Sequence, residues 1–175
     1  MTNLHTLILG GIRSGKSRLA ERLAIESQLS VTYIATATAE DEEMRQRIAN
    51  HREQRPDHWH VIEEPIKLAE ALSNVNTEHC ILLDCLTLWL TNLLLTDDFC
   101  LFTQERDAFL NILPTLKNRM IIVSNETNMG ITPMGELSRR YCDEAGRLHQ
   151  ALAQHCDQVV LTVAGLPHTL KGQSL

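Results

Sequence analysis

Five short apolar segments recur along the chain, each separated from the next by a stretch of helical periodicity. They consist mostly of Ile, Val and Leu, without regular alternation with polar residues. This pattern is typical of strands that are covered on both faces of a sheet. We therefore predict strands at residues 4–9, 31–35, 79–83, 120–124 and 159–163.

Apolar residues return every three or four positions between these segments. The clearest helix is near the C-terminus, where the repeating positions are Leu137, Tyr141, Ala145, Leu148 and Leu152. Further helices are predicted at residues 16–28, 40–52, 66–72, 86–95 and 103–113. Strands that alternate with helices imply right-handed crossovers and a mainly parallel sheet, so the predicted class is three-layer α/β. A chain of 175 residues without a long linker is expected to form one domain, residues 1–175.

The carboxyl ends of parallel strands share one edge of the sheet, and ligands bind in a crevice there. Small or polar residues follow the predicted strands: Gly10-Gly11, Ala35-Thr36-Ala37, Asp84, Ser124-Asn125-Glu126 and Ala164-Gly165. Loops are polar in most proteins, so this pattern locates the edge without identifying the ligand.

The first predicted strand leads into a phosphate-binding loop. Its residues are Gly10, Gly11, Ile12, Arg13, Ser14, Gly15, Lys16 and Ser17, which match the pattern Gly-x-x-x-x-Gly-Lys-Ser. A strand, a glycine-rich turn and a helix start together aim backbone N–H groups at a polyphosphate. In this arrangement Lys16 reaches the β- and γ-phosphates and the Ser17 hydroxyl ligates Mg²⁺. We therefore predict that the chain binds a nucleoside triphosphate.

Asp84 ends a second apolar strand, the form of a Walker B element. Such a carboxylate holds Mg²⁺ beside the loop Ser or Thr. The alternative is that Asp84 caps the helix that opens at Leu86. Together with the phosphate loop, the pattern favours the metal role.

Residues 47–65 contain further candidates, each with an ordinary alternative. His51 could attack a phosphorus atom as a neutral imidazole while Arg52 and Arg55 offset phosphate charge, or it could be a solvated surface histidine. Glu63 could contact a sugar hydroxyl or merely end a strand before Pro65. The pair His58 and His60 around Trp59 is better explained by packing than by a metal.

Composition narrows the classes of partner. The net charge of −6 argues against extended nucleic-acid binding, which needs many phosphate-neutralising side chains. Apolar runs are too short to span a bilayer, and the N-terminus does not resemble a signal peptide, so a cytoplasmic location is expected. Five cysteines without a Cys-x-x-Cys pair indicate small buried or reduced thiols rather than a disulfide framework or a zinc site.

The ordered set of motifs resembles the bifunctional adenosylcobinamide kinase/adenosylcobinamide-phosphate guanylyltransferase family of cobalamin biosynthesis. The resemblance covers nearly the whole chain. Its markers are the phosphate loop, Tyr33 to Ala37, Asp41 to Met44, His51-Arg52-x-x-Arg55-Pro56-x-x-Trp59, Glu63, Asp84 to Trp89, Ser124-Asn125-Glu126 and Met129-Gly130-Ile131-x-Pro133.

This resemblance implies two reactions. Adenosylcobinamide is phosphorylated from ATP or GTP, and GMP from GTP is then transferred to adenosylcobinamide phosphate through a guanylylated histidine, which matches His51. The implied nucleotide contacts are residues 10–17, Ala35, Thr36, Ala37, Arg52, Glu53, Gln54, Arg55, Glu63 and Asp84, with Mg²⁺ at Ser17 and Asp84. The implied fold is a RecA-like phosphate-loop domain, assembled as a homotrimer, with no nucleic acid and no membrane span.

Three positions depart from the family pattern. Asn50 precedes His51 where some relatives have a second histidine, Thr127-Asn128 follows Glu126 where a Val-Gly pair is common, and His149 stands where relatives often carry Asn. Because Asn tolerates left-handed backbone geometry, we expect the turn at Asn128 to persist. The alternatives to the bifunctional enzyme are an enzyme with one of the two activities, a nucleotide sensor and a DNA motor subunit.

Overall fold

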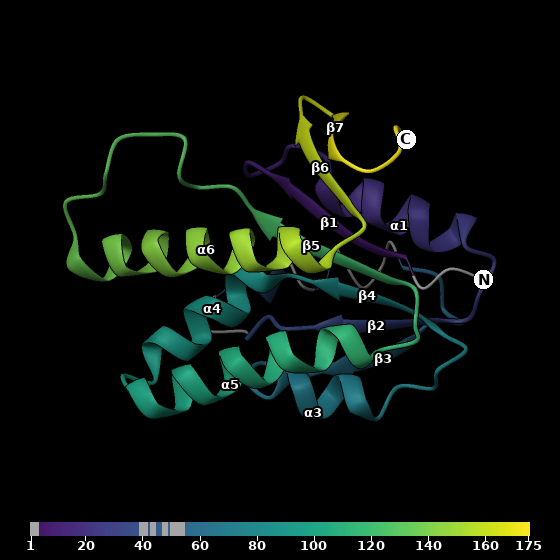
Figure 1. Cartoon of the computed structure of the whole chain (residues 1–175), viewed down its shortest axis with the longest axis horizontal. Helices are drawn as coiled ribbons and strands as arrows, with labels where there is room; N and C mark the ends of the chain where they lie inside the picture. Colours follow the sequence, from purple (N-terminus) through teal and green to yellow (C-terminus); the bar gives the residue numbers. More distant parts are fainter. Residues whose placement is uncertain (1–3, 39–41, 43–44, 47–48, 50–54) are drawn as a thin grey trace.

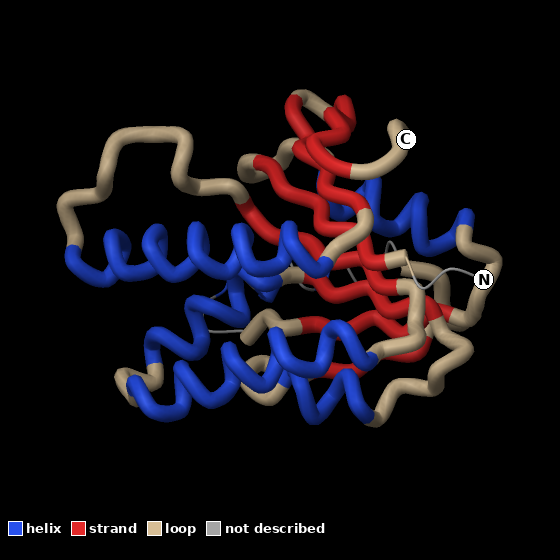
Figure 2. The backbone as a smooth tube through the Cα atoms, in the orientation of Figure 1, coloured by secondary structure: helices blue, strands red, loops and turns tan. Residues whose placement is uncertain are grey.

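Seven strands form one twisted sheet in a computed structural model that describes residues 4–38, 42, 45–46, 49 and 55–175 (Figure 2). The strand order is β3-β2-β4-β5-β1-β6-β7, and every neighbouring pair is parallel except β6 and β7. The strands are β1 (His5–Gly10), β2 (Val31–Ala35), β3 (His60–Glu63), β4 (Cys80–Asp84), β5 (Met120–Asn125), β6 (Gln158–Val163) and β7 (Leu166–Lys171).

Helices cover both faces of this sheet (Figure 1). One face carries α1 (Lys16–Glu26), and the other carries α3 (Leu68–Ser73), α4 (Leu86–Leu95), α5 (Phe99–Ile112) and α6 (Glu136–His155), with the short η1 (Leu113–Thr115) after α5. Alternate strand residues belong to different cores: Ile8 packs with the α1 side chains, whereas Leu7 and Leu9 pack on the opposite face. Since both faces are covered, the central strands are buried along almost their whole length, and the predicted three-layer α/β class is confirmed.

The five predicted strands are present with boundaries shifted by at most one residue, but two further strands were not predicted. Both lie at the edges of the sheet, where β3 is mostly exposed and β7 contains Pro167. An edge strand has one unpaired side and tolerates proline and polar residues. Such strands lack the apolar run by which the central strands are found.

The predicted helices other than the one at 40–52 are also found, with one clear error in a boundary. The helix predicted to begin at Thr103 begins at Phe99, because the Asp98 carboxylate accepts hydrogen bonds from the backbone N–H groups of Cys100 and Leu101. Aspartate is a favoured N-cap residue, so Asp98 was a signal for this boundary that the apolar periodicity alone did not contain. Most of the helix predicted at 40–52 lies outside the described residues; residues 42, 45, 46 and 49 are helical.

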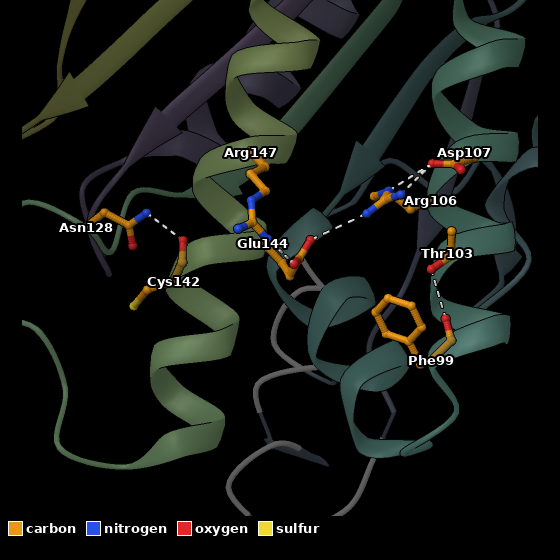
Figure 3. A network of polar contacts seen from close by, with 8 residues as sticks. All are labelled: Phe99, Thr103, Arg106, Asp107, Asn128, Cys142, Glu144 and Arg147. Atoms are coloured by element: carbon orange, nitrogen blue, oxygen red, sulfur yellow. Dashed lines mark hydrogen bonds and ion pairs between the residues drawn. The ribbon is translucent and has the colours of Figure 1, made fainter.

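Polar contacts join α5 to α6 (Figure 3). The Arg106 guanidinium lies 2.8 Å from Asp107 on its own helix and 3.6 Å from the half-buried Glu144 carboxylate of α6. Glu144 also contacts Arg147 at 2.5 Å. These contacts fix the middle of α6, the part that faces the carboxyl edge of the sheet.

A long connection between β5 and α6 projects from the body of the molecule (Figures 1 and 2). It carries apolar side chains that are strongly exposed, namely Met129, Ile131 and Met134. Across the described residues, helices that are long and apolar enough to cross a membrane are absent.

Candidate nucleotide site

The phosphate loop closes through its own backbone. Ser14 N–H donates to the Gly11 carbonyl at 3.2 Å, and Leu19 N–H donates to the Gly15 carbonyl at 3.0 Å as α1 begins. The Ser14 carbonyl in turn accepts from Gly165 N–H at 2.9 Å, which ties the loop to the turn between β6 and β7. The loop is therefore a rigid cradle rather than a free turn.

Two glycines make this close approach possible. A Cβ on Gly10 would lie 2.4 Å from the Thr162 carbonyl oxygen and 2.6 Å from the Ser14 hydroxyl. Gly15 has φ +98°, and a Cβ there would lie 3.1 Å from Gly165 Cα. Left-handed backbone suits glycine because it has no Cβ to clash with the neighbouring carbonyl. The sequence motif thus has a direct steric cause.

Lys16 lies at the mouth of the cradle, only 7% exposed, and its Nζ donates to the Gly11 carbonyl at 2.6 Å. Burial lowers the pKa of this ammonium, while Cys85 and Asp84 act in the opposite direction. A partly desolvated cation with one hydrogen bond to a carbonyl retains donors for an anion. Lys16 is thus placed to bind phosphate.

The helix α1 starts at this loop without a side-chain cap, since its N-cap is Gly15. Its first turn also has no acidic residue. Unsatisfied N–H groups and the helix dipole at such an end attract anions. The Ser17 hydroxyl, in that first turn, makes no hydrogen bond with another described residue and can serve as a ligand.

Asp84 ends β4 as predicted, and the N-cap of the following helix is Cys85 rather than Asp84. Its carboxylate accepts a hydrogen bond from the Tyr33 hydroxyl at 3.2 Å. The guanidinium carbon of Arg55 lies 3.6 Å from the centre of the Tyr33 ring, and the Arg55 Nε is buried. Burial raises the pKa of Tyr33 well above its usual range, so the phenol remains a donor. Tyr33 therefore contacts Arg55 through its ring and Asp84 through its hydroxyl.

The predicted segment Ala35 to Ala37 follows β2 and is fixed to its surroundings. The buried Thr36 hydroxyl donates to the Cys85 carbonyl at 2.6 Å, and Asn92 donates to the Thr36 carbonyl at 2.8 Å. Glu63 pairs with Ala35 across the β2–β3 ladder. From the sheet order, β2 and β3 lie three and four strand spacings from β1, roughly 14 and 19 Å. These residues are too far to share one phosphate with the loop.

Four predicted residues lie outside the described residues, namely His51, Arg52, Glu53 and Gln54. Their roles remain predictions. Of the two nearby histidines, His60 stacks on His79 with ring centres 5.1 Å apart, which fits the packing interpretation.

The carboxyl end of β5 forms a second polar region, which the sequence marked only as a motif of the resembled family. The Asn125 N–H donates to the Thr87 hydroxyl at 2.8 Å, and the Glu126 N–H donates to the Gly10 carbonyl at 2.9 Å. Ser124 Oγ lies 2.8 Å from His149 Nε2, in the core between β5 and α6. The helical spacing of apolar residues in α6 indicated its buried face, but it could not predict that His149 contacts Ser124.

For the segment after Glu126, the prediction was that a left-handed Asn128 would preserve the turn. Asn128 does not adopt a left-handed backbone conformation. Instead its N–H donates to the Glu126 carboxylate at 2.7 Å, and its side-chain amide donates to the Cys142 carbonyl at 2.9 Å (Figure 3). These hydrogen bonds tie Asn128 to Glu126 on one side and to α6 on the other.

Residues 6–170 match the sequence profile of a family described as cobinamide kinase / cobinamide phosphate guanyltransferase. The chain is 61% identical to the bifunctional adenosylcobalamin biosynthesis protein CobP of Pseudomonas aeruginosa, over 98% of this chain and all of that one. It is 37% identical to the bifunctional adenosylcobalamin biosynthesis protein CobU of Escherichia coli, over 94% and 98% of the two chains.

The fold has more distant relatives among solved structures. A RadB recombinase aligns with a TM-score of 0.54 at 16% identity, over 91% of this chain and 74% of that one. A protein of Pyrococcus horikoshii OT3 gives the same score at 10% identity, over 99% and 88%. The predicted RecA-like architecture is thereby confirmed.

Proposed function

The chain belongs to the cobinamide kinase / cobinamide phosphate guanyltransferase family, and from this premise we propose that one phosphate loop serves both reactions. First, adenosylcobinamide is phosphorylated by ATP or GTP. Second, GMP from GTP is transferred to the new phosphate, which gives adenosylcobinamide-GDP and pyrophosphate. The observation that carries this proposal is the buried Lys16 ammonium at the mouth of a closed loop, within electrostatic reach of Asp84.

In the kinase step the loop holds the donor triphosphate. Backbone N–H groups of α1 and the Lys16 ammonium are donors that stabilise negative charge on the phosphates. The γ-phosphoryl group passes to the hydroxyl of the acceptor. Because the cradle is preformed, its donors need little reorganisation as charge shifts toward the leaving diphosphate.

In the guanylyl transfer we assign the nucleophile to His51. Its neutral imidazole attacks the α-phosphorus, pyrophosphate leaves, and the phosphate of the acceptor then takes GMP from the histidine. We assign Arg52 and Arg55 the role of offsetting the negative charge of the phosphates. Arg55 lies over the ring of Tyr33, whose hydroxyl donates to Asp84, and this position supports the assignment.

We further propose that Ser17 and Asp84 hold a Mg²⁺ ion. A hydroxyl and a carboxylate are the hard oxygen donors that Mg²⁺ prefers, together with water and substrate phosphates. One Asp84 oxygen accepts from Tyr33, which orients the carboxylate at the edge of the sheet. When bound, such an ion neutralises phosphate charge.

The remaining contacts are assigned to the nucleoside. Ala35, Thr36, Ala37 and Glu63 follow strands β2 and β3, on the side of β4 away from the loop. Glu53 and Gln54 are assigned to the nucleotide with their arginine neighbours. A nucleotide whose phosphates bind the loop and which extends along the carboxyl edge of the sheet would contact these residues with its sugar and base.

The test is to incubate the protein and Mg²⁺ with GTP labelled at either the α- or the γ-phosphorus. We expect an acid-labile label on the protein from α-labelled GTP alone, and its loss in His51→Ala. The exposed His58→Ala is the matched control and should keep the label. Label that persists in His51→Ala would reject His51 as the nucleophile. Transfer of only the γ-phosphoryl group or only GMP to the corrinoid would indicate an enzyme with a single activity.

We propose a homotrimer in the cytoplasm, from the resemblance of the whole chain to the family. Sedimentation should give a particle of three times the 19.8 kDa chain mass. A particle of one or two chain masses would contradict the trimer.

A further inference from the structure

Glu126 has no role in the nucleotide contacts assigned above, yet its backbone is hydrogen-bonded to the start of the phosphate loop. We propose that Glu126 is the general base of the kinase step, accepting the proton of the acceptor hydroxyl. This inference rests on the proposed function, because it concerns the first of its two reactions.

Strand order places Glu126 between the two nucleotide elements. β5 is the strand between β1, which ends in the phosphate loop, and β4, which ends in Asp84. Asn125 pairs with Gly10 in the parallel ladder, and Glu126 N–H donates to the Gly10 carbonyl at 2.9 Å. The residue is therefore fixed by its backbone at the start of the cradle.

The two carboxylate oxygens of Glu126 have different surroundings. Oε1 accepts from Asn128 N–H at 2.7 Å, which holds the side chain in place. Oε2 lies 3.8 Å from His149 Nδ1, too far for a hydrogen bond. Within the described part of the chain, no arginine or lysine forms an ion pair with this side chain, which is 16% exposed. One oxygen is thus free to accept a proton.

Its histidine neighbour does not neutralise this carboxylate. His149 is buried, and Nε2 lies against the Ser124 hydroxyl at 2.8 Å. Desolvation lowers the pKa of His149, with Glu126 acting in the opposite direction. A neutral ring at this position places no full positive charge beside the carboxylate.

The two reactions differ in their need for a base. In the kinase step the acceptor oxygen forms a bond to the γ-phosphorus, the bond to the bridging oxygen breaks, and the nucleoside diphosphate leaves. The hydroxyl proton passes to Glu126 and then to water. In guanylyl transfer the nucleophiles are a neutral imidazole and an ionised phosphate, neither of which has to lose a proton first.

The test compares the two half-reactions in Glu126→Gln and in wild type, by single turnover. The amide oxygen can still accept from Asn128 N–H, so the turn is preserved while the base is lost. We expect phosphoryl transfer from γ-labelled ATP to adenosylcobinamide to fall roughly 100- to 10,000-fold. GMP transfer from α-labelled GTP to adenosylcobinamide phosphate should change less than about threefold, on the same reasoning.

Two further variants complete the design. Glu126→Asp keeps a carboxylate and should recover part of the phosphoryl transfer. Glu78→Gln makes the same chemical change at an exposed position ahead of β4, on the opposite edge of the sheet, and should leave both rates unchanged. Phosphoryl transfer within a few-fold of wild type in Glu126→Gln, or a parallel loss of both transfers, would overturn the assignment. Wild type without either transfer would instead reject the proposed function itself.

Discussion

The phosphate loop and the carboxyl end of β5 lie side by side at one edge of the sheet, but they are built differently. The loop is made by consecutive residues whose contacts are mostly among themselves, with Gly165 as the main outside partner. The β5 end is assembled from distant segments, since Asn125 contacts Thr87 of α4 and Ser124 contacts His149 of α6. A local motif fixes the phosphates, whereas tertiary structure decides which groups face the acceptor.

Among the variants that act on both reactions, loss of the loop lysine should have the largest effect. Lys16→Ala removes the buried donor at the mouth of the cradle, and we expect each transfer to slow by on the order of 100- to 1,000-fold. Lys117→Ala, an exposed lysine ahead of β5, is the control. The measurement is the rate of each half-reaction at saturating substrate. Kinase turnover at the wild-type rate in Lys16→Ala would show that the loop does not serve both reactions.

Asp84→Asn should act on the metal rather than on the cradle. Removal of one carboxylate charge should raise the Mg²⁺ concentration for half-maximal rate by roughly 10- to 100-fold in both reactions. The measurement is a Mg²⁺ titration of each half-reaction, with the exposed Asp143→Asn as control. An unchanged Mg²⁺ requirement would remove Asp84 from the metal site.

Gly10 and Gly11 provide a matched pair inside the loop. Gly10→Ala forces a Cβ against the Thr162 carbonyl and the Ser14 hydroxyl, and should lower the free energy of unfolding by about 1–3 kcal/mol. A Cβ on Gly11 would have no described atom within 4 Å. Gly11→Ala should therefore change the free energy of unfolding by less than about 0.5 kcal/mol. Denaturant unfolding of the two variants measures this. Equal stabilities would mean that loop closure is not sterically fixed.

The smallest effect concerns pH. Burial lowers the pKa of His149, so the unfolded chain binds a proton more readily than the folded one as the pH falls below the ordinary histidine value. The free energy of unfolding should therefore decrease as the pH falls from about 7 to about 5.5. His149→Asn should make this decrease smaller, by less than about 1 kcal/mol over the interval. Unfolding curves at several pH values test this, with the exposed His58→Asn as control. An unchanged slope in His149→Asn would contradict a buried neutral imidazole.

The sequence predicted the central fold because the inner strands and the loop carry strong local signals. Residues 10–17 and Asp84 lie where the motifs place them. Edge strands β3 and β7 were missed because one-sided burial leaves no apolar run. Neither the Tyr33 link between Arg55 and Asp84 nor the pairing of His149 with Ser124 could be predicted, since each depends on segments joined only by the sheet order.

The central claim is that one phosphate cradle serves both nucleotide reactions. The most direct measurement is equilibrium binding of labelled ATP and GTP to the same protein, separately and together. We predict one triphosphate per chain, mutual displacement of the two nucleotides, and loss of binding of both in Lys16→Ala. Two triphosphates bound per chain, or GTP binding that ATP cannot displace, would contradict a shared cradle.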